Sequence, residues 1–243
     1  MLTLDNLTIT YERHPAVHHV SGHFDEGSLT ALVGPNGAGK SSLIKALAGL
    51  LKPSGGHIDR HGLAPSDIAY LPQMTAIDDN FPMSVRDVVL MGHWRRVGAF
   101  ISLGKAAFTA AYEALRAVGL EGFEKRRFSS LSVGQQQRAL FARVMVADCP
   151  IILLDEPFSA IDTRTVDDLL ALIHRWQGEG RTLIAVLHDM AQIRAHFPQS
   201  LLLARRLIAW GPTAEVLSAA NLEAARLMGE AWDDHAEPCA GAA

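Results

Sequence analysis

The sequence has few cysteines and no long apolar segment. Its 243 residues include two cysteines, Cys149 and Cys239. Two are too few for a disulfide framework and favour a reducing compartment. No run reaches the roughly 18 consecutive apolar residues that suggest a membrane-spanning helix. Met1 leads directly into a strand-like segment, so neither a membrane span nor a secretory signal is expected.

Positive charge is also scarce. The chain has 22 lysines and arginines against 26 acidic residues, and its formal net charge is −4 at pH 7. The densest basic group, residues 125–127, is expected to be a solvated helix end. No nucleic acid is therefore expected as a partner. Hydrophobic residues make up 49% of the sequence, which allows a large core and an exposed docking patch.

The most informative segment is GPNGAGKSS, residues 34–42. It has the spacing G-x-x-x-x-G-K-S, follows an apolar run at 29–33 and precedes an amphipathic stretch at 42–51. This order predicts a strand, a tight loop and a helix. The glycines let backbone N–H groups approach phosphate oxygens, and the positive end of the helix favours the same anion. These glycines are Gly34, Gly37 and Gly39.

Two polar side chains complete this loop. Lys40 is expected to reach the β- and γ-phosphates of a nucleotide. Ser41 is expected to supply a hydroxyl to Mg²⁺, which prefers hard oxygen ligands. The segment therefore predicts binding of a nucleoside triphosphate with Mg²⁺.

Two adjacent carboxylates follow a second apolar run, IILLDEP at residues 151–157. Because neighbouring side chains on a strand point to opposite faces, Asp155 and Glu156 are expected to have different tasks. One carboxylate could hold Mg²⁺ or its waters, and the other could polarise an attacking water.

Polar residues also stand at the ends of two other expected elements. Ser132 and Gly134, in LSVGQQQR, open an expected helix, where they could meet an anion or simply cap the helix. His188 follows an expected strand over 182–187, at the edge where α/β sheets bind ligands. Taken alone, His188 would more often be structural.

Together these segments resemble the nucleotide-binding subunit of an ABC transporter. The resemblance extends from about residue 2 to 217 and rests on six motifs in the family's order. They are a Walker A loop at 34–41, a glutamine loop at Gln73, the family signature at 131–135, a Walker B motif at 151–156, a D-loop through Asp162 and a switch histidine at His188.

The resemblance implies an α/β fold. It comprises a P-loop NTPase (RecA-like) core with an N-terminal antiparallel β subdomain and an inserted ABC-type α-helical subdomain. We expect one ABC ATPase domain over residues 1–217. Its core would be formed by 1–77 and 148–217, with the helical lobe inserted at 78–147 and a C-terminal tail at 218–243.

The resemblance also implies a Mg²⁺-dependent ATPase. Glu156 would be the general base and His188 would sense the γ-phosphate, whereas Asp155, Ser41 and Gln73 would hold Mg²⁺. From its spacing alone Tyr11 would be an ordinary strand-surface aromatic, but the resemblance makes it the residue that stacks on adenine. The residues implied to contact ATP are Tyr11, Gly34, Asn36, Gly37, Ala38, Gly39, Lys40, Ser41, Ser42, Ser132, Gly134, Gln135 and Asp162.

The implied active unit is a head-to-tail dimer with ATP sandwiched between two copies of the chain. Ser132, Gly134 and Gln135 would contact the ATP bound to the other copy. The signature usually reads LSGGQ, and here Val133 replaces its first glycine. Because Ser132 and Gly134 remain, we expect the signature site to function. The property that Val133 could change is the affinity for ATP in the dimer.

The run MSVRDVVLMGHW, residues 83–94, resembles the subunits of importers for zinc, manganese and related chelated metals. It implies a transmembrane permease, an extracytoplasmic binding protein and a location at the cytoplasmic face of the membrane, with zinc the first expected substrate. Val88, Val89 and Met91 would line the groove that receives the permease. An exporter subunit and a soluble regulatory ATPase remain alternatives.

Two groups of possible metal ligands are expected to have no metal role. Neither group has the spacing of a closed zinc site. The N-terminal group is expected to consist of surface histidines: His14, His18, His19 and His23. The tail group is expected to belong to a flexible end: Asp233, Asp234, His235 and Cys239.

Overall fold

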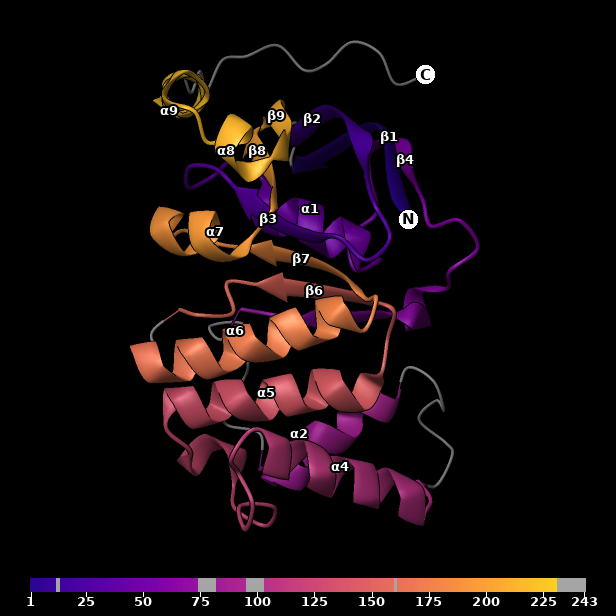
Figure 1. Cartoon of the computed structure of the whole chain (residues 1–243). Helices are drawn as coiled ribbons and strands as arrows, with labels where there is room; N and C mark the ends of the chain where they lie inside the picture. Colours follow the sequence, from indigo (N-terminus) through magenta and orange to yellow (C-terminus); the bar gives the residue numbers. More distant parts are fainter. Residues whose placement is uncertain (12–13, 74–81, 95–102, 160, 231–243) are drawn as a thin grey trace. The chain divides into compact units, whose positions relative to one another are not determined.

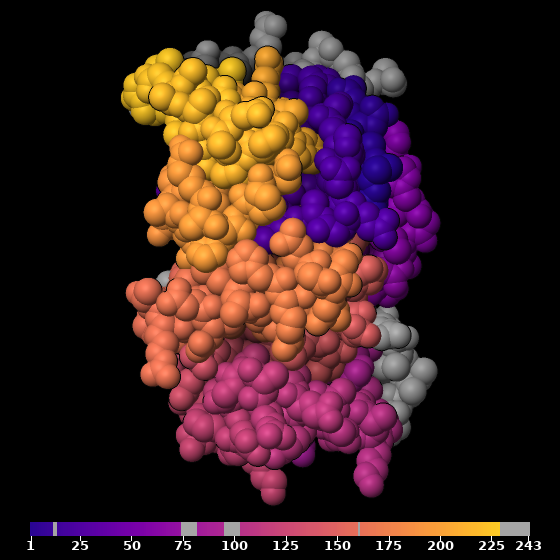
Figure 2. All heavy atoms as spheres, viewed as in Figure 1, coloured from indigo at the N-terminus to yellow at the C-terminus, as the bar shows by residue number. Residues whose placement is uncertain are grey.

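The computed structural model describes residues 1–11, 14–73, 82–94, 103–159 and 161–230, and Figure 1 traces them by colour. The chain forms two compact units. The first combines Met1–Pro65 with Thr182–Ala243, and the second is Ser66–Arg181. The first unit is therefore built from the two ends of the chain. Its C-terminal segments, yellow in Figure 2, pack directly beside its indigo N-terminal segment.

The first unit begins with a three-stranded antiparallel sheet in the order β2-β1-β4. Apolar and polar residues alternate along the central strand, so that Leu4, Leu7 and Ile9 are buried on one face. This confirms the predicted N-terminal antiparallel part. The strands are β1 (Leu2–Tyr11), β2 (His14–Phe24) and β4 (Gly55–Asp59).

The same unit contains a mostly parallel sheet segment in the order β7-β3-β8-β9. β3 is parallel to β7 and to β8, whereas β8 and β9 are antiparallel. Every residue of β3 is buried, which explains why four of its five residues are apolar, with Thr30 the exception. The elements are β3 (Leu29–Val33), β7 (Thr182–Val186), β8 (Gln199–Ala204), β9 (Arg206–Pro212), α1 (Lys40–Leu47), α7 (Met190–His196), α8 (Thr213–Val216) and α9 (Ala219–Glu230).

The second unit joins a parallel strand pair to a helical region. The pair β5 and β6 runs in register from Ile68↔Ile151 to Leu71↔Leu154. α5 packs against α2, α4, α6 and β5, and the rings of Phe141 on α5 and Trp176 on α6 stack at 5.8 Å. The elements are β5 (Ile68–Leu71), β6 (Ile151–Asp155), α2 (Val85–Leu90), α4 (Lys105–Ala117), α5 (Val133–Ala147) and α6 (Thr163–Gly178), with 3-10 turns η1 (Pro65–Asp67), η3 (Met91–His93) and η4 (Phe128–Ser130).

Local capping signals set several helix boundaries. Ser84 and Asp87 form the capping box expected at the start of α2. The expected helix over 42–51 instead begins at Lys40 and ends at Leu47. It stops there because Gly49, at φ +72°, donates its N–H to Ala46 O, and Leu50 donates to Lys45 O. The boundaries predicted from apolar spacing were therefore wrong by a few residues.

The predicted C-terminal tail contains α9 from Ala219 to Glu230. Its candidate metal ligands, residues 233–239, lie outside the described residues. Within the described ranges, no group of three or more histidine, cysteine or acidic residues is placed to hold a metal ion. No helix in this described part combines the length and the apolar composition that crossing a bilayer requires.

Candidate functional site

The glycine-rich loop lies in the first unit, between the end of β3 and the start of α1. Gly34 has φ +153°, and a Cβ atom there would overlap the carbonyl oxygen of Leu203. Gly39 has φ +91°, and a Cβ atom there would overlap the carbonyl oxygen of Ala16. These two glycines therefore allow the loop to pack against backbone from β2 and from the end of β8.

A further contact joins this loop to the turn between β8 and β9. The backbone N–H of Arg205 donates to Ala38 O at 3.0 Å, and Arg205 itself has φ +62°. Ala38 is buried, and its N–H donates to Pro35 O. Sequence reasoning missed Leu203 and Arg205, because only the sheet order brings them next to residues 34–38.

Gly39 and Gly37 form a matched pair for mutation. Both have positive φ, but nothing lies within 4 Å of a Cβ atom at Gly37. We expect Gly37→Ala to lower the free energy of unfolding by roughly 1 kcal/mol, from backbone strain alone. Gly39→Ala should cost roughly 3 kcal/mol or more, because the methyl group also meets a backbone carbonyl. Urea unfolding of the two variants measures the difference, and equal losses would contradict the packing of Gly39 on Ala16.

Lys40 is the first residue of α1, directly after the loop, and is only 6% exposed. Its Nζ donates to Gly34 O at 2.8 Å and to Pro35 O at 2.9 Å. Gly39 stands at the N-cap of α1, where it has no side chain to cap the first-turn N–H groups. A buried ammonium and a helix start without a side-chain cap suit an anion such as a phosphate chain.

Other first-unit residues predicted to meet ATP lie around this loop or at strand ends. Asn36 belongs to the loop, and Ser41 and Ser42 are in the first turn of α1. Tyr11 is the last residue of β1 and is 48% exposed, and exposed His188 follows β7. Their roles toward ATP stay predictions.

In the second unit, the structure brings Gln73 and Glu156 together. Gln73 Nε2 donates to Glu156 Oε2 at 2.8 Å, and Ser159 Oγ donates to the same oxygen at 3.2 Å. Glu156 has φ +50°, which turns the chain sharply after β6. These two bonds hold the carboxylate in one orientation. A carboxylate oriented in this way can act as a general base toward water.

The neighbouring Asp155 is almost fully buried. Tyr70 donates its hydroxyl to Asp155 Oδ2 at 3.3 Å. Burial, and next the charge of Asp155, raise the pKa of Tyr70 well above its usual value, so Tyr70 stays a donor. Sequence reasoning missed Tyr70, although a tyrosine near the end of the buried strand β5 signals a polar partner.

The side chains of the signature segment lie at the exposed start of α5. Ser132 Oγ accepts from the N–H of Gln135, and Gln135 Oε1 accepts from the N–H of Ser132. Val133 is 43% exposed, and Gly134 follows it in the first turn. Ser132 therefore caps α5, as one of the two sequence interpretations expected. The contact with ATP across a dimer stays a prediction.

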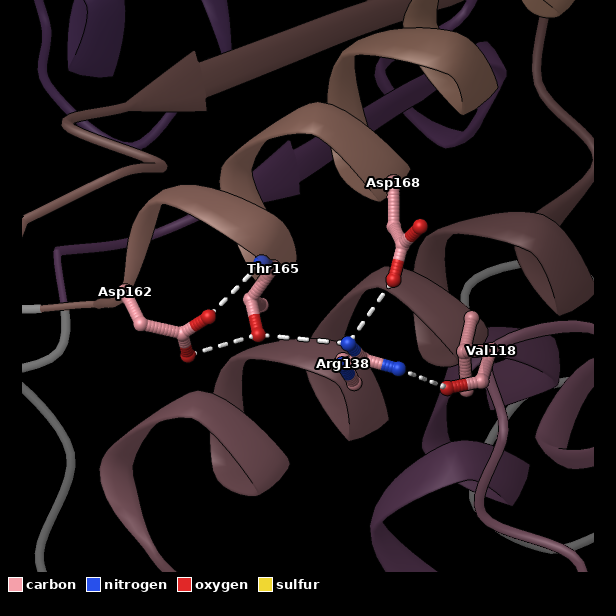
Figure 3. A network of polar contacts seen from close by, with 5 residues as sticks. All are labelled: Val118, Arg138, Asp162, Thr165 and Asp168. Carbon is pink, nitrogen blue, oxygen red and sulfur yellow. Dashed lines mark hydrogen bonds and ion pairs between the residues drawn. The ribbon is translucent and has the colours of Figure 1, made fainter.

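Asp162 caps α6 and is linked to α5 through an arginine (Figure 3). Its two carboxylate oxygens accept from the Thr165 N–H at 2.9 Å and from Thr165 Oγ1 at 2.8 Å. These bonds, backbone first, lower the pKa of Asp162. Arg138 Nη2 donates to Thr165 Oγ1 and Asp168 Oδ2, and its Nη1 donates to Val118 O.

Each unit contains donors whose chemistry suits a magnesium nucleotide. The first unit offers the Ser41 hydroxyl, and the second offers the Asp155 carboxylate and the Gln73 amide oxygen, all of them the oxygen ligands that Mg²⁺ prefers. The loop at 34–41 offers backbone N–H groups and one buried ammonium for phosphates.

Comparisons with known proteins agree with this chemistry. A family model described as "ABC transporter" matches residues 17–159. The manganese transport system ATP-binding protein MntB of Bacillus subtilis strain 168 is 39% identical over 224 residues, covering 90% of each chain. The zinc transport system ATP-binding protein TroB of Treponema pallidum strain Nichols is 40% identical over 212 residues, covering 86% of this chain and 80% of TroB.

A solved structure supports the same relationship. It is the dimeric, post-hydrolysis state of an ATP-binding cassette bound to ADP and phosphate. The match has a TM-score of 0.76 and 26% identity, covering 88% of this chain and 99% of the other. This likeness confirms the predicted fold class, including the inserted helical subdomain.

Proposed function

The chain belongs to the ABC transporter family of ATPases, and from this premise we propose that it powers the import of a divalent transition metal through a separate permease. The observation that carries the proposal is the identity of about 40% with ATP-binding subunits named for manganese and zinc transport. The oriented Glu156 carboxylate supplies the chemical step that such a motor needs.

Each site residue has a task in this proposal. Lys40 and the backbone N–H groups of residues 34–41 bind the phosphates, and Tyr11 stacks on adenine. Glu156 takes a proton from the attacking water, while Gln73 and Ser159 keep its carboxylate oriented. His188 contacts the γ-phosphate. Mg²⁺, held by Ser41, Asp155 and Gln73, would neutralise charge that develops on the phosphates.

The proposed partners follow from the family. A second copy would supply Ser132, Gly134, Gln135 and Asp162 to the ATP bound by the first copy. The solved dimer of a related cassette supports the involvement of a second copy. A permease would hold the dimer at the cytoplasmic face of the membrane. An extracytoplasmic binding protein would deliver the metal. Of the three residues expected to line the permease groove, Met91 is part-exposed and would face the permease, whereas Val88 and Val89 are buried in the core, so their expected place in the groove is corrected.

Metal selectivity is proposed to reside in these partners rather than in this chain. The described residues contain no group of three or more candidate metal ligands placed to hold an ion. The relatives are named for two different metals, manganese and zinc. We propose zinc as the first substrate to test and manganese as the second.

Deleting the gene is expected to lower the cellular content of the transported metal under limitation. The motor would be absent, so uptake against a gradient would stop, and added metal should restore growth. Elemental analysis of the deletion strain, complemented with wild-type or Glu156→Gln protein, measures this. Only the wild-type copy should restore the metal.

The same strains test the alternatives. Unchanged zinc and manganese together with a defect in lipid or drug export would overturn import in favour of an exporter. Unchanged metal content, with no membrane protein copurifying, would indicate a regulatory ATPase. Either result would leave the ATPase assignment intact.

A further inference from the structure

The second unit contains a cavity of about 520 Å³ beside Arg138. It lies where the end of α4 meets α5 and α6, and its volume is in the range of small-molecule sites. Leu169 and Leu172 contribute apolar lining. The charged lining residues are three arginines and one acid: Arg116, Arg138, Arg175 and Asp168.

The arginines retain donors that the described part of the chain does not use. Arg138 has five N–H donors and commits three, to Val118 O, Thr165 Oγ1 and Asp168 Oδ2. The Arg116 side chain makes no hydrogen bond or ion pair with any described residue, although its backbone carbonyl accepts from the Gly119 N–H. Arg175 Nε forms an ion pair with Glu179 Oε1 at 3.6 Å, which is longer than a hydrogen bond and leaves the N–H donors of Arg175 available. The cavity therefore presents unused guanidinium donors and an excess of positive charge.

We propose that this cavity binds a small molecule carrying two phosphate groups. Guanidinium groups match phosphate oxygens in pairs, which a single ammonium cannot do. The carbonyl oxygen of Val118 at the end of α4 would repel an anion, but Arg138 Nη1 already covers it at 3.2 Å. The leucines would contact the carbon skeleton of the ligand.

Arg138 connects the cavity to Asp162, one of the residues expected to contact ATP. Figure 3 shows its guanidinium between Asp168, Val118 and Thr165, and Thr165 Oγ1 donates onward to Asp162. A phosphate that competes with Asp168 and Thr165 for Arg138 changes the bonding of the α6 cap. A change in ATP turnover through this cap would rest on the proposed function, whereas binding of the ligand does not.

Calorimetric titration with fructose 1,6-bisphosphate tests the site, with fructose as the uncharged comparison. A Lys40→Ala background weakens the phosphate loop as a competing site. We expect the bisphosphate to bind and fructose not to bind. The double variant Arg116→Gln, Arg175→Gln should bind roughly 10- to 100-fold more weakly. Arg164→Gln removes an exposed charge from the same helix, α6, outside the cavity lining, and should bind normally.

Three outcomes would overturn the site: no binding of the bisphosphate to wild-type protein, equal affinity in the double variant, or binding that disappears with Lys40→Ala alone. Arg116 and Arg175 are exposed, so their replacement should leave the core intact. Thermal unfolding of the double variant checks this. If the bisphosphate binds as expected and the protein hydrolyses no ATP, the proposed function fails and the cavity remains a ligand site.

Discussion

Replacing Glu156 with glutamine is expected to slow ATP hydrolysis by roughly 10² to 10⁴ while ATP binding stays close to wild type. The amide cannot accept the proton of the attacking water. Its oxygen can still accept from Gln73 Nε2, which lies 2.8 Å from Glu156 Oε2. The local geometry is therefore kept while the base is lost. Phosphate release measures turnover, and fluorescence titration with ATP measures binding.

Two further observations sharpen this experiment. The variant should accumulate as an ATP-bound dimer in size-exclusion chromatography, because hydrolysis no longer releases the copies. Glu113→Gln, at an exposed position on α4, removes a carboxylate of the same type and should hydrolyse ATP normally. A Glu156→Gln protein with wild-type turnover would show that the base lies elsewhere.

Replacing Lys40 with alanine is expected to weaken ATP binding by roughly 10- to 100-fold and to reduce hydrolysis with it. The change removes the buried positive charge of the loop. It also removes the bonds from Nζ to Gly34 O and Pro35 O. Binding and turnover should therefore fall together, unlike in Glu156→Gln.

Lys45→Ala is the matched control for this variant. Lys45 lies on the same helix, α1, but is exposed, so its loss should leave affinity for ATP nearly unchanged. Calorimetric titration with ATP compares the three proteins. Wild-type affinity in Lys40→Ala would exclude this ammonium from the phosphate site.

Features that depend on nearby residues could be predicted from the sequence. The glycine spacing and the Ser84–Asp87 capping box each lie within a few residues, and the structure contains the expected loop and helix start. The buried strands β3 and β6 could also be predicted, because strands covered on both faces are mostly apolar, as these are apart from Thr30 and Asp155.

Contacts between distant segments could not be predicted. The sequence around Gln73 does not predict its hydrogen bond to Glu156. The sequence around Arg138 likewise does not predict its hydrogen bonds to Thr165 and Asp168. Such pairs depend on which strands and helices become neighbours. Side-chain spacing along one element carries no information about that arrangement.

The packing of the glycine-rich loop against Leu203 and Arg205 has a consequence for biosynthesis. β3 lies between β7 and β8, and Ala38 O accepts from the Arg205 N–H. The loop is synthesised early, but the strands and the turn that support it are translated near the end. On the ribosome, residues 34–41 can therefore reach their final conformation only after most of the chain has been synthesised. Contacts this distant in sequence slow folding, and a nascent chain truncated before residue 205 cannot complete its phosphate loop.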